Sequence, residues 1–238
     1  MNSRKIEWIL DWLFPGRCPV CDDVVPLPGE KICPDCRDRL LYAFEPLCCK
    51  CGRPVRSLEK EFCSDCSTKN HEYKEGAALF QYDSVMKHSI YRFKYQGRKE
   101  YGSFYGEQIA EYLGDRIRSW KPDLLLPVPL HPTKQNKRGY NQATVLAEAV
   151  GKRLGIPVAD GLVRRVKNTT PQKELDEAGR QNNLKKAFII CQNDVKLKTI
   201  IIVDDIYTTG STVDAVAKEL ISAGAHAVYY ISLAIGER

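Results

Sequence analysis

The chain has 238 residues, 43% of them apolar, and a formal net charge of +6 at neutral pH. This length accommodates one ordinary globular domain with a small module held by metal or disulfides, and it excludes two full-sized domains. The positive charge favours polyanionic partners, such as a diphosphate sugar or nucleic acid. No run reaches the ~20 apolar residues of a transmembrane helix, and no secretory cleavage site is visible, so we expect a cytoplasmic protein.

The N-terminal residues 1–16 have the pattern of an amphipathic helix. Apolar side chains recur at helical spacing from Ile6 to Leu13, and Pro15 and Gly16 end the pattern. Packing against the next element is the simpler role for this helix. Its two tryptophans also suit an alternative role, a peripheral contact with a membrane or a protein partner.

Eight of the ten cysteines form four CxxC pairs within residues 17–68. The unit C-x2-C-x11-C-x2-C occurs twice, offset by 30 residues. Two CxxC turns supply the four thiolates of a closed tetrahedral zinc site, so we predict a double zinc ribbon with two structural zinc ions. An iron–sulfur cluster or disulfides are less favoured, and ligation within each repeat or crossed between repeats stays open. The predicted ligands are Cys18, Cys21, Cys33, Cys36, Cys48, Cys51, Cys63 and Cys66.

A second domain is expected over residues 71–238, after a polar joint at residues 67–70. Apolar strand patterns alternate with helical ones, which predicts an α/β fold with a parallel sheet flanked by helices. The expected strands are 77–82, 124–129, 188–191, 199–203 and 228–233, and the expected helices are 85–93, 104–119, 142–154 and 212–223.

The most informative segment is residues 200–212. Four branched apolar residues predict a buried central strand, and Asp204 and Asp205 follow at its carboxyl end, where ligands bind in open α/β sheets. The next turn is small and hydroxyl-rich, and it opens a helix, so its amides suit a phosphate. Phosphate and sugar diol together describe a ribose 5-phosphate site; the alternative is a strand and turn with two solvated acids. The turn residues are Thr208, Thr209, Gly210, Ser211 and Thr212.

A second constellation follows the strand at 124–126. Three prolines between residues 127 and 132 predict an extended backbone, so that amides near Val128, Pro129 and Leu130 face a diphosphate. Lys134, Lys137 and Arg138 would neutralise that anion, although a solvated basic loop is the alternative.

The segment 200–212 resembles, position by position, the motif with which type I phosphoribosyltransferases bind phosphoribosyl diphosphate (PRPP). The resemblance implies the type I phosphoribosyltransferase fold. It also implies that Asp204 and Asp205 hold the ribose hydroxyls, with Mg²⁺ nearby, and that the turn wraps the 5-phosphate.

The whole chain resembles the ComF competence-protein family. The cysteine pairs carry this resemblance together with the PRPP-type motif and the patterns F-K-Y-x-G at 93–97, P-V-P-L at 127–130, R-G-Y-N-Q at 138–142 and T-x-Q at 170–172. It implies a PRPP-binding protein that acts in DNA uptake and natural transformation.

Two alternatives to a binding role alone stay open. A catalytically active phosphoribosyltransferase in nucleotide or amine metabolism would use Asp204, Asp205, Lys134 and Arg138, covered by residues 167–184. A single-stranded DNA-binding adaptor, working with a DNA-uptake helicase, would use the cations and aromatic residues that alternate over residues 92–101.

Overall fold

The computed structural model describes residues 16–26, 29–167, 187–191 and 195–236. The helix expected over residues 1–16 therefore lies outside the described residues, apart from Gly16, and so does nearly all of the expected cover at 167–184. No helix within the described ranges is long and apolar enough to cross a membrane.

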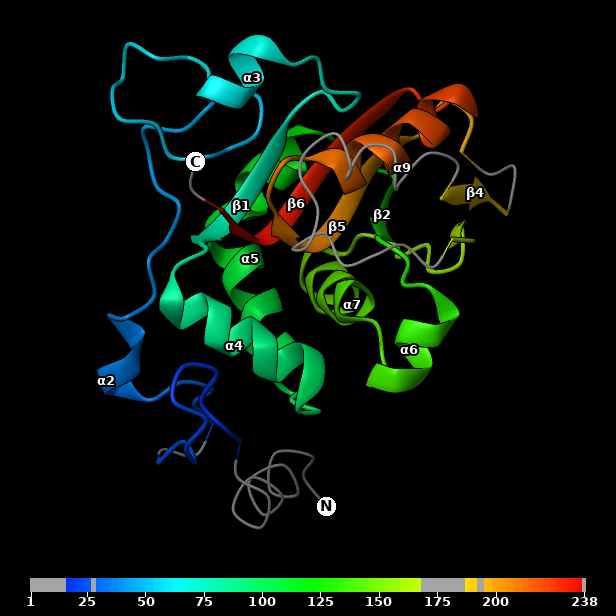
Figure 1. Cartoon of the computed structure of the whole chain (residues 1–238). Coiled ribbons are helices and arrows are strands. Elements are labelled where there is room, and N and C mark those ends of the chain that lie inside the picture. Colours follow the sequence, from blue (N-terminus) through cyan, green and yellow to red (C-terminus); the bar gives the residue numbers. More distant parts are fainter. Residues whose placement is uncertain (1–15, 27–28, 168–186, 192–194, 237–238) are drawn as a thin grey trace.

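The centre of the molecule is a parallel sheet of four strands in the order β1-β6-β5-β2 (Figure 1). The strands are β1 (Gly76–Gln81), β2 (Leu124–Pro127), β5 (Thr199–Tyr207) and β6 (Ala227–Ile235). The flanking helices are α4 (Ser84–Tyr95), α5 (Tyr101–Ser119), α6 (Pro132–Arg138), α7 (Gln142–Leu154) and α9 (Ser211–Ser222). The expected α/β architecture, a parallel sheet flanked by helices, is confirmed.

The two faces of the sheet carry different helices. Successive side chains of a strand point to opposite faces. Ile201 and Val203 pack in a core with α4, α5 and α7, and we call this side the α5 face. Ile200 and Ile202 pack in a second core with α9, on what we call the α9 face. All four side chains are completely buried, as expected for β5, which is one of the two inner strands of the sheet.

One strand was expected in the wrong place. Residues 188–191 contain a strand, β4 (Phe188–Ile190), but it pairs antiparallel with β3 (Val163–Arg165) and does not join the parallel sheet. Phe188 is buried in the α9-face core while Ile189 is exposed, so this hairpin buries one side only. Half-buried strands of this kind suit an antiparallel pair, whereas strands of a parallel sheet are buried on both faces.

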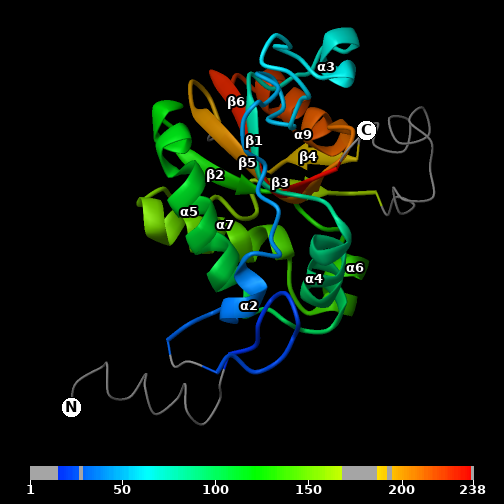
Figure 2. The same ribbon diagram turned by 90° about the vertical axis from the view of Figure 1, so that its left-hand side faces the viewer.

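The two cysteine repeats lie on opposite faces of the sheet, at opposite ends of the molecule (Figures 1 and 2). The first ribbon, residues 17–37, ends in α2 (Pro34–Arg37) and packs into the α5-face core. The second ribbon, residues 47–68, ends in α3 (Ser64–Thr68) and packs into the α9-face core. Each ribbon is therefore fastened to its own side of the α/β domain.

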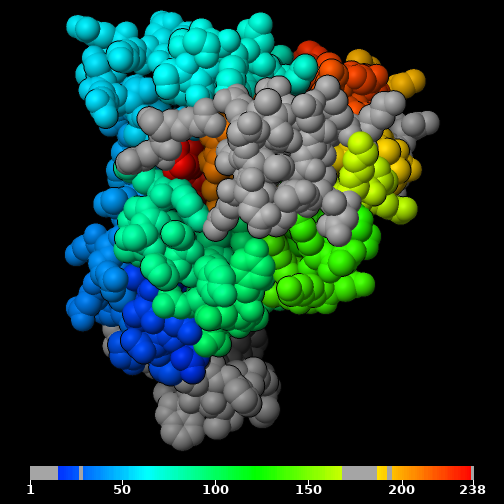
Figure 3. Space-filling view, viewed as in Figure 1, coloured from blue at the N-terminus to red at the C-terminus, as the bar shows by residue number. Residues whose placement is uncertain are grey.

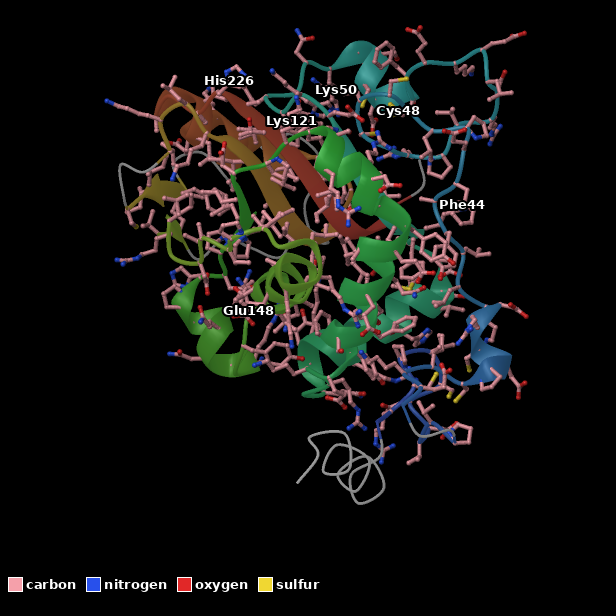
Figure 4. All side chains as sticks on the ribbon, turned by 180° about the vertical axis from the view of Figure 1, so that it is seen from behind. Phe44, Cys48, Lys50, Lys121, Glu148 and His226 are labelled. Atoms are coloured by element: carbon pink, nitrogen blue, oxygen red, sulfur yellow. The ribbon has the colours of Figure 1, made fainter. Side chains whose placement is uncertain are left out.

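A linker of residues 38–46 joins the ribbons along the edge of the sheet. The Ala43 N–H donates to the Leu79 carbonyl at 2.8 Å, and the Gln81 N–H donates to the Leu41 carbonyl at 2.8 Å. Figure 4 shows Phe44 on this linker, with Cys48 in the second ribbon beyond it. The linker thus covers β1, which would otherwise be an open edge strand.

Candidate functional site

The two adjacent acids lie inside β5, because this strand continues to Tyr207 instead of ending at Val203. Their side chains consequently point to opposite faces of the sheet. Asp205 faces α4, where the Lys94 ammonium lies 2.7 Å from its carboxylate. Asp204 lines a shallow depression on the other side, shared with Thr208 and Ser211 of the following turn. The structure therefore brings Asp204, and not Asp205, to the face of the candidate phosphate turn.

The turn at residues 208–212 has the backbone of an anion site. Gly210 adopts φ +78°, and a Cβ there would lie 2.5 Å from the Tyr207 hydroxyl, so the position requires glycine. Helix α9 begins directly after it, its N-cap residue Gly210 supplies no side-chain cap, and the Ser211 N–H lies 3.4 Å from the Thr209 hydroxyl oxygen. Amides at a helix N-terminus bind anions, and the positive end of the helix dipole adds to the attraction.

The surroundings of Asp204 make it a weak acid. Burial, followed by the nearby Asp205 charge, raises the pKa of Asp204 to about 7, and Lys94 and Arg165 oppose the rise. A carboxyl with this pKa is ready to change its charge when a cation or a sugar diol reaches it at neutral pH.

The residues expected to bind the diphosphate follow β2, and the structure differs from the expectation in its amides and in its basic residues. The Val128 N–H donates to the Val203 carbonyl at 2.9 Å, so this amide serves the sheet. Pro129 has no N–H, which leaves Leu130 as the next amide. The basic residues lie on a helix that was not expected, α6, which begins at Pro132; His131 before it still has an extended backbone. Proline is favoured in the first turn of a helix, which is why the last of the three prolines begins one.

Lys134 and Arg138 lie on α6 with different surroundings. Burial and the nearby Arg165 and Arg138 charges lower the pKa of Lys134. Arg138 lies over the Tyr95 ring, 4.8 Å from its centroid, and donates to the Tyr95 hydroxyl at 3.0 Å. The structure thus groups Lys134 with Arg165, while Arg138 turns toward α4.

The segment 138–142 connects the end of β2 with the end of α4 through side-chain hydrogen bonds. Asn141 donates its amide to the Val128 carbonyl at 3.0 Å, and Tyr140 and Gln142 both donate to the Phe93 carbonyl at the end of α4. These contacts tie the end of β2 to the helix that carries Lys94.

Sequence reasoning placed Lys94 in the candidate DNA strip and gave neither Lys94 nor Arg165 a role in the PRPP site. Arg165 is a buried residue of β3 whose charge acts on both Asp204 and Lys134. The alternation Val163-Arg164-Arg165 of a half-buried strand is a signal that one of the two arginines points inward.

The proposed DNA strip at 92–101 has other partners in the structure. Arg92 donates to the Val20 carbonyl at 3.1 Å, and Arg98 binds both carboxylate oxygens of Asp22 at 2.7 and 2.9 Å. Tyr101 donates to the same carboxylate at 2.5 Å. These side chains fasten the first ribbon, which weakens the argument for a continuous DNA-binding surface there.

The cysteines gather as two groups of four, each from one repeat: Cys18, Cys21, Cys33 and Cys36 in the first, and Cys48, Cys51, Cys63 and Cys66 in the second. The four sulfur atoms of each group lie within 4.8 Å of one another. The printed sequence left crossed pairing open, and the structure shows pairing within each repeat.

The sulfur positions fit zinc. A tetrahedral ion with Zn–S bonds of about 2.3 Å places its ligands about 3.8 Å apart. Cys21 and Cys33 are 3.8 Å apart, and Cys51 and Cys63 are 3.7 Å apart. None of the ten cysteines forms a disulfide. With all four ligands supplied by protein, the centres are structural and leave no position for substrate.

Comparison with known proteins agrees with this architecture. The double zinc ribbon domain family matches residues 9–67, and the phosphoribosyl transferase domain family matches residues 106–235. The chain is 29% identical to competence protein F of Haemophilus influenzae over 93% of this chain and 97% of that protein. It is 30% identical to the DNA utilization protein YhgH of Escherichia coli, covering 90% and 94% of the two chains. It is 29% identical to competence protein ComFC of Bacillus subtilis, covering 83% and 80%.

The fold and these matches define a protein with a phosphoribosyltransferase-type domain and two zinc sites of a double zinc ribbon. More narrowly, the chain belongs to the ComF family of competence and DNA utilization proteins.

Proposed function

We propose that this protein binds PRPP with Mg²⁺ at the carboxyl end of β5, and that it serves DNA uptake or utilization as the names of its relatives state. The observation that carries the proposal is that the glycine turn at 208–212, which opens α9, lines the same depression as Asp204. The turn at 208–212 receives the 5-phosphate, and Asp204 receives the ribose hydroxyls or the metal ion. Lys134 and Arg165 supply positive charge for the diphosphate.

The two carboxylates have different roles in this site. Asp204 lies on the face of the turn, whereas Asp205 neutralises Lys94 on the other face. We therefore expect Asp204 to contact the ligand and Asp205 to act through Lys94. Mg²⁺, when bound with PRPP, supplies additional charge compensation for the diphosphate.

Calorimetric titration of PRPP and Mg²⁺ into the zinc-loaded protein tests the binding proposal. Asp204→Ala should weaken binding more than tenfold, and Asp205→Ala should weaken it less. Asp115→Ala removes a carboxylate that is fully exposed on α5 and is the matched control. No binding by the folded, zinc-loaded protein would contradict the proposal, as would equal binding by the Asp204 variant and the control.

A second candidate function, phosphoribosyl transfer, is favoured by a cleft at the same edge of the sheet. Its volume is about 720 Å³, and it lies between the second ribbon and the ends of β1 and β6. In Figure 3 the surface of β6 is visible between the second ribbon above and α4 below. A transferase needs such a second pocket for its acceptor. The described residues that line it include Arg56, Lys60, Phe62, Gln81 and Ile235.

Release of diphosphate from PRPP in the presence of single nucleobases or amines is the measurement for turnover. Release that depends on one acceptor and is lost in Asp204→Ala would establish transfer. PRPP binding without release by any acceptor tested would favour a binding protein.

For the biological role, we expect a chromosomal Asp204→Ala allele to lower the use of external DNA by the source organism. Counting transformants, or measuring growth on DNA, checks this expectation. Unchanged counts with normal protein levels would contradict it.

A further inference from the structure

The second ribbon contacts the back of the candidate phosphate turn through a buried arginine. Arg53 is only 5% exposed, and its guanidinium donates to the Thr208 carbonyl at 2.7 Å. The same guanidinium donates to the Asp65 carboxylate at 3.1 Å. Arg53 thus joins the first residue of the turn to the interior of the ribbon.

Zinc ligands flank both members of this ion pair. Arg53 follows Cys51 by two residues, and Asp65 directly precedes Cys66. A metal that closes the four thiolates fixes the backbone on either side of the pair, and the negative thiolates offset the buried guanidinium charge. Without the metal, the second ribbon cannot bury enough apolar surface to hold Arg53 in this position.

The same part of the chain holds the turn at two further points. The Tyr230 hydroxyl donates to the Cys51 carbonyl at 2.6 Å, and its ring stacks on Tyr207, with centroids 4.6 Å apart. After the last zinc ligand, His71 lies 2.8 Å from the Asp214 carboxylate in the first turn of α9. Tyr207 before the turn also shares a hydrogen bond of 2.6 Å with Tyr73, so the segment that leaves the ribbon contacts residues on both sides of the turn.

Among the described residues of the first ribbon, none forms a hydrogen bond with the turn. Its polar contacts with the domain include the Arg98–Asp22 pair and the contact of the Ser89 hydroxyl with the Pro19 carbonyl, both on the α5 face. The turn lies at the start of α9, whose apolar side chains pack in the core of the opposite face.

We propose that zinc in the second ribbon and the phosphoribosyl ligand are linked through Arg53, so that each strengthens the binding of the other, while zinc in the first ribbon is not linked. Arg53 is a positioning residue, since it orients the backbone of the turn without reaching the ligand. This inference rests on the proposed PRPP site. Linkage is reciprocal by thermodynamic necessity, so it can be measured from the side of the metal.

The experiment measures zinc release from the full-length protein at equilibrium with increasing chromogenic chelator, with and without saturating PRPP and excess Mg²⁺. Couplings between sites are commonly on the order of tenfold. We therefore expect PRPP to raise the affinity of one of the two zinc sites about tenfold. Alkylation of the freed cysteines and mass spectrometry identify the protected ribbon, which should be the second.

Three variants sharpen the test. Arg53→Ala should retain two zinc ions but lose most of the protection by PRPP, and it should bind PRPP about tenfold more weakly. Arg53→Lys keeps a positive charge and should recover part of both effects, which a merely structural role would not predict. Arg98→Ala, the matched control, cuts the fastening of the first ribbon and should leave the protection unchanged.

The outcomes separate this inference from the proposed function. PRPP binding to the wild-type protein with unchanged zinc release from the second ribbon would overturn the linkage alone. Equal protection of both ribbons would also overturn it. Absence of PRPP binding would overturn both proposals. Because the wild-type measurement needs no variant, a failure of Arg53→Ala to fold does not affect the test.

Discussion

The two zinc ribbons have identical cysteine spacing but contact the α/β domain in different ways. In each ribbon, the residue after the first CxxC pair has the same left-handed backbone, with φ +68° at Asp22 and at Gly52. Asp22 tolerates this conformation and directs its carboxylate to Arg98. Gly52 packs against β1 so closely that a Cβ would lie 2.8 Å from the Gly76 carbonyl oxygen.

This difference shows what the repeat specifies. The cysteines fix the metal site and the local backbone, while the residue beside them makes a different contact with the domain in each ribbon. An aspartate pairs the first ribbon with Arg98 and with Tyr101 of α5, and a glycine allows the second to approach the sheet backbone. Among the described residues, the second ribbon alone forms a hydrogen bond with the phosphate turn.

The largest effect is expected from removing one equivalent zinc ligand in each ribbon. Cys51→Ser should weaken PRPP binding at least tenfold, because it loosens the ribbon that holds Thr208. Cys21→Ser should change that affinity less than about threefold. Calorimetry of both variants, with their zinc content measured, checks the difference. Equal losses of affinity would mean that the ribbons do not differ in this respect.

The next largest effect is expected from exchanging Asp22 and Gly52, the residues that follow the first CxxC pair of each ribbon. Gly52→Asp introduces side-chain atoms against the Gly76 carbonyl and should lower the free energy of unfolding by about 1–3 kcal/mol, as overpacking does. Asp22→Gly keeps the backbone conformation but removes the partner of Arg98, and it should cost about 1 kcal/mol because the pair is partly exposed. Denaturant unfolding of both variants gives the comparison. A larger loss for Asp22→Gly would contradict it.

The last predicted effect is a pH dependence confined to the α9 face. Folding raises the pKa of Asp204 from 3.8 to about 7, so the folded protein binds this proton more tightly than the unfolded chain does. The group therefore contributes stability at low pH, and this contribution is lost as the pH rises toward 7. Asp204→Asn should melt at a higher temperature than the wild type near pH 8, with the difference shrinking toward pH 4. A difference independent of pH would contradict this account.

Much of the fold followed from apolar patterns. The helix expected at residues 142–154 is α7, Gln142–Leu154, and the strand at 77–82 lies within one residue of β1. These elements combine a strong periodicity with clear end signals. In α7, the Asn141 side chain caps the N-terminus by accepting from the Ala143 N–H, and Gly155 ends the helix in the left-handed conformation.

The wrong predictions concern residues whose placement depends on contacts with distant parts of the chain. Asp204 and Asp205 are polar, so the pattern ended the strand before them, yet pairing with β6 continues to Tyr207. That continuation is what turns the two acids to opposite faces. The contact of Arg53 with Thr208 joins residues far apart in the chain, and no local pattern marks it. The same holds for the partners of Arg92 and Arg98, which a linear reading assigned to a DNA surface.

The pairing of β1 with β6 has a consequence for synthesis of the protein on the ribosome. Gly76 lies opposite Tyr230, so β1 can join the sheet only after β6 has been synthesised. Each zinc ribbon can close as soon as its own four cysteines have emerged, because its ligands are local in sequence. The nascent chain therefore carries two metal modules beside an unpaired strand until β6 has emerged, and the linker at 38–46 is the partner already present to shield that strand.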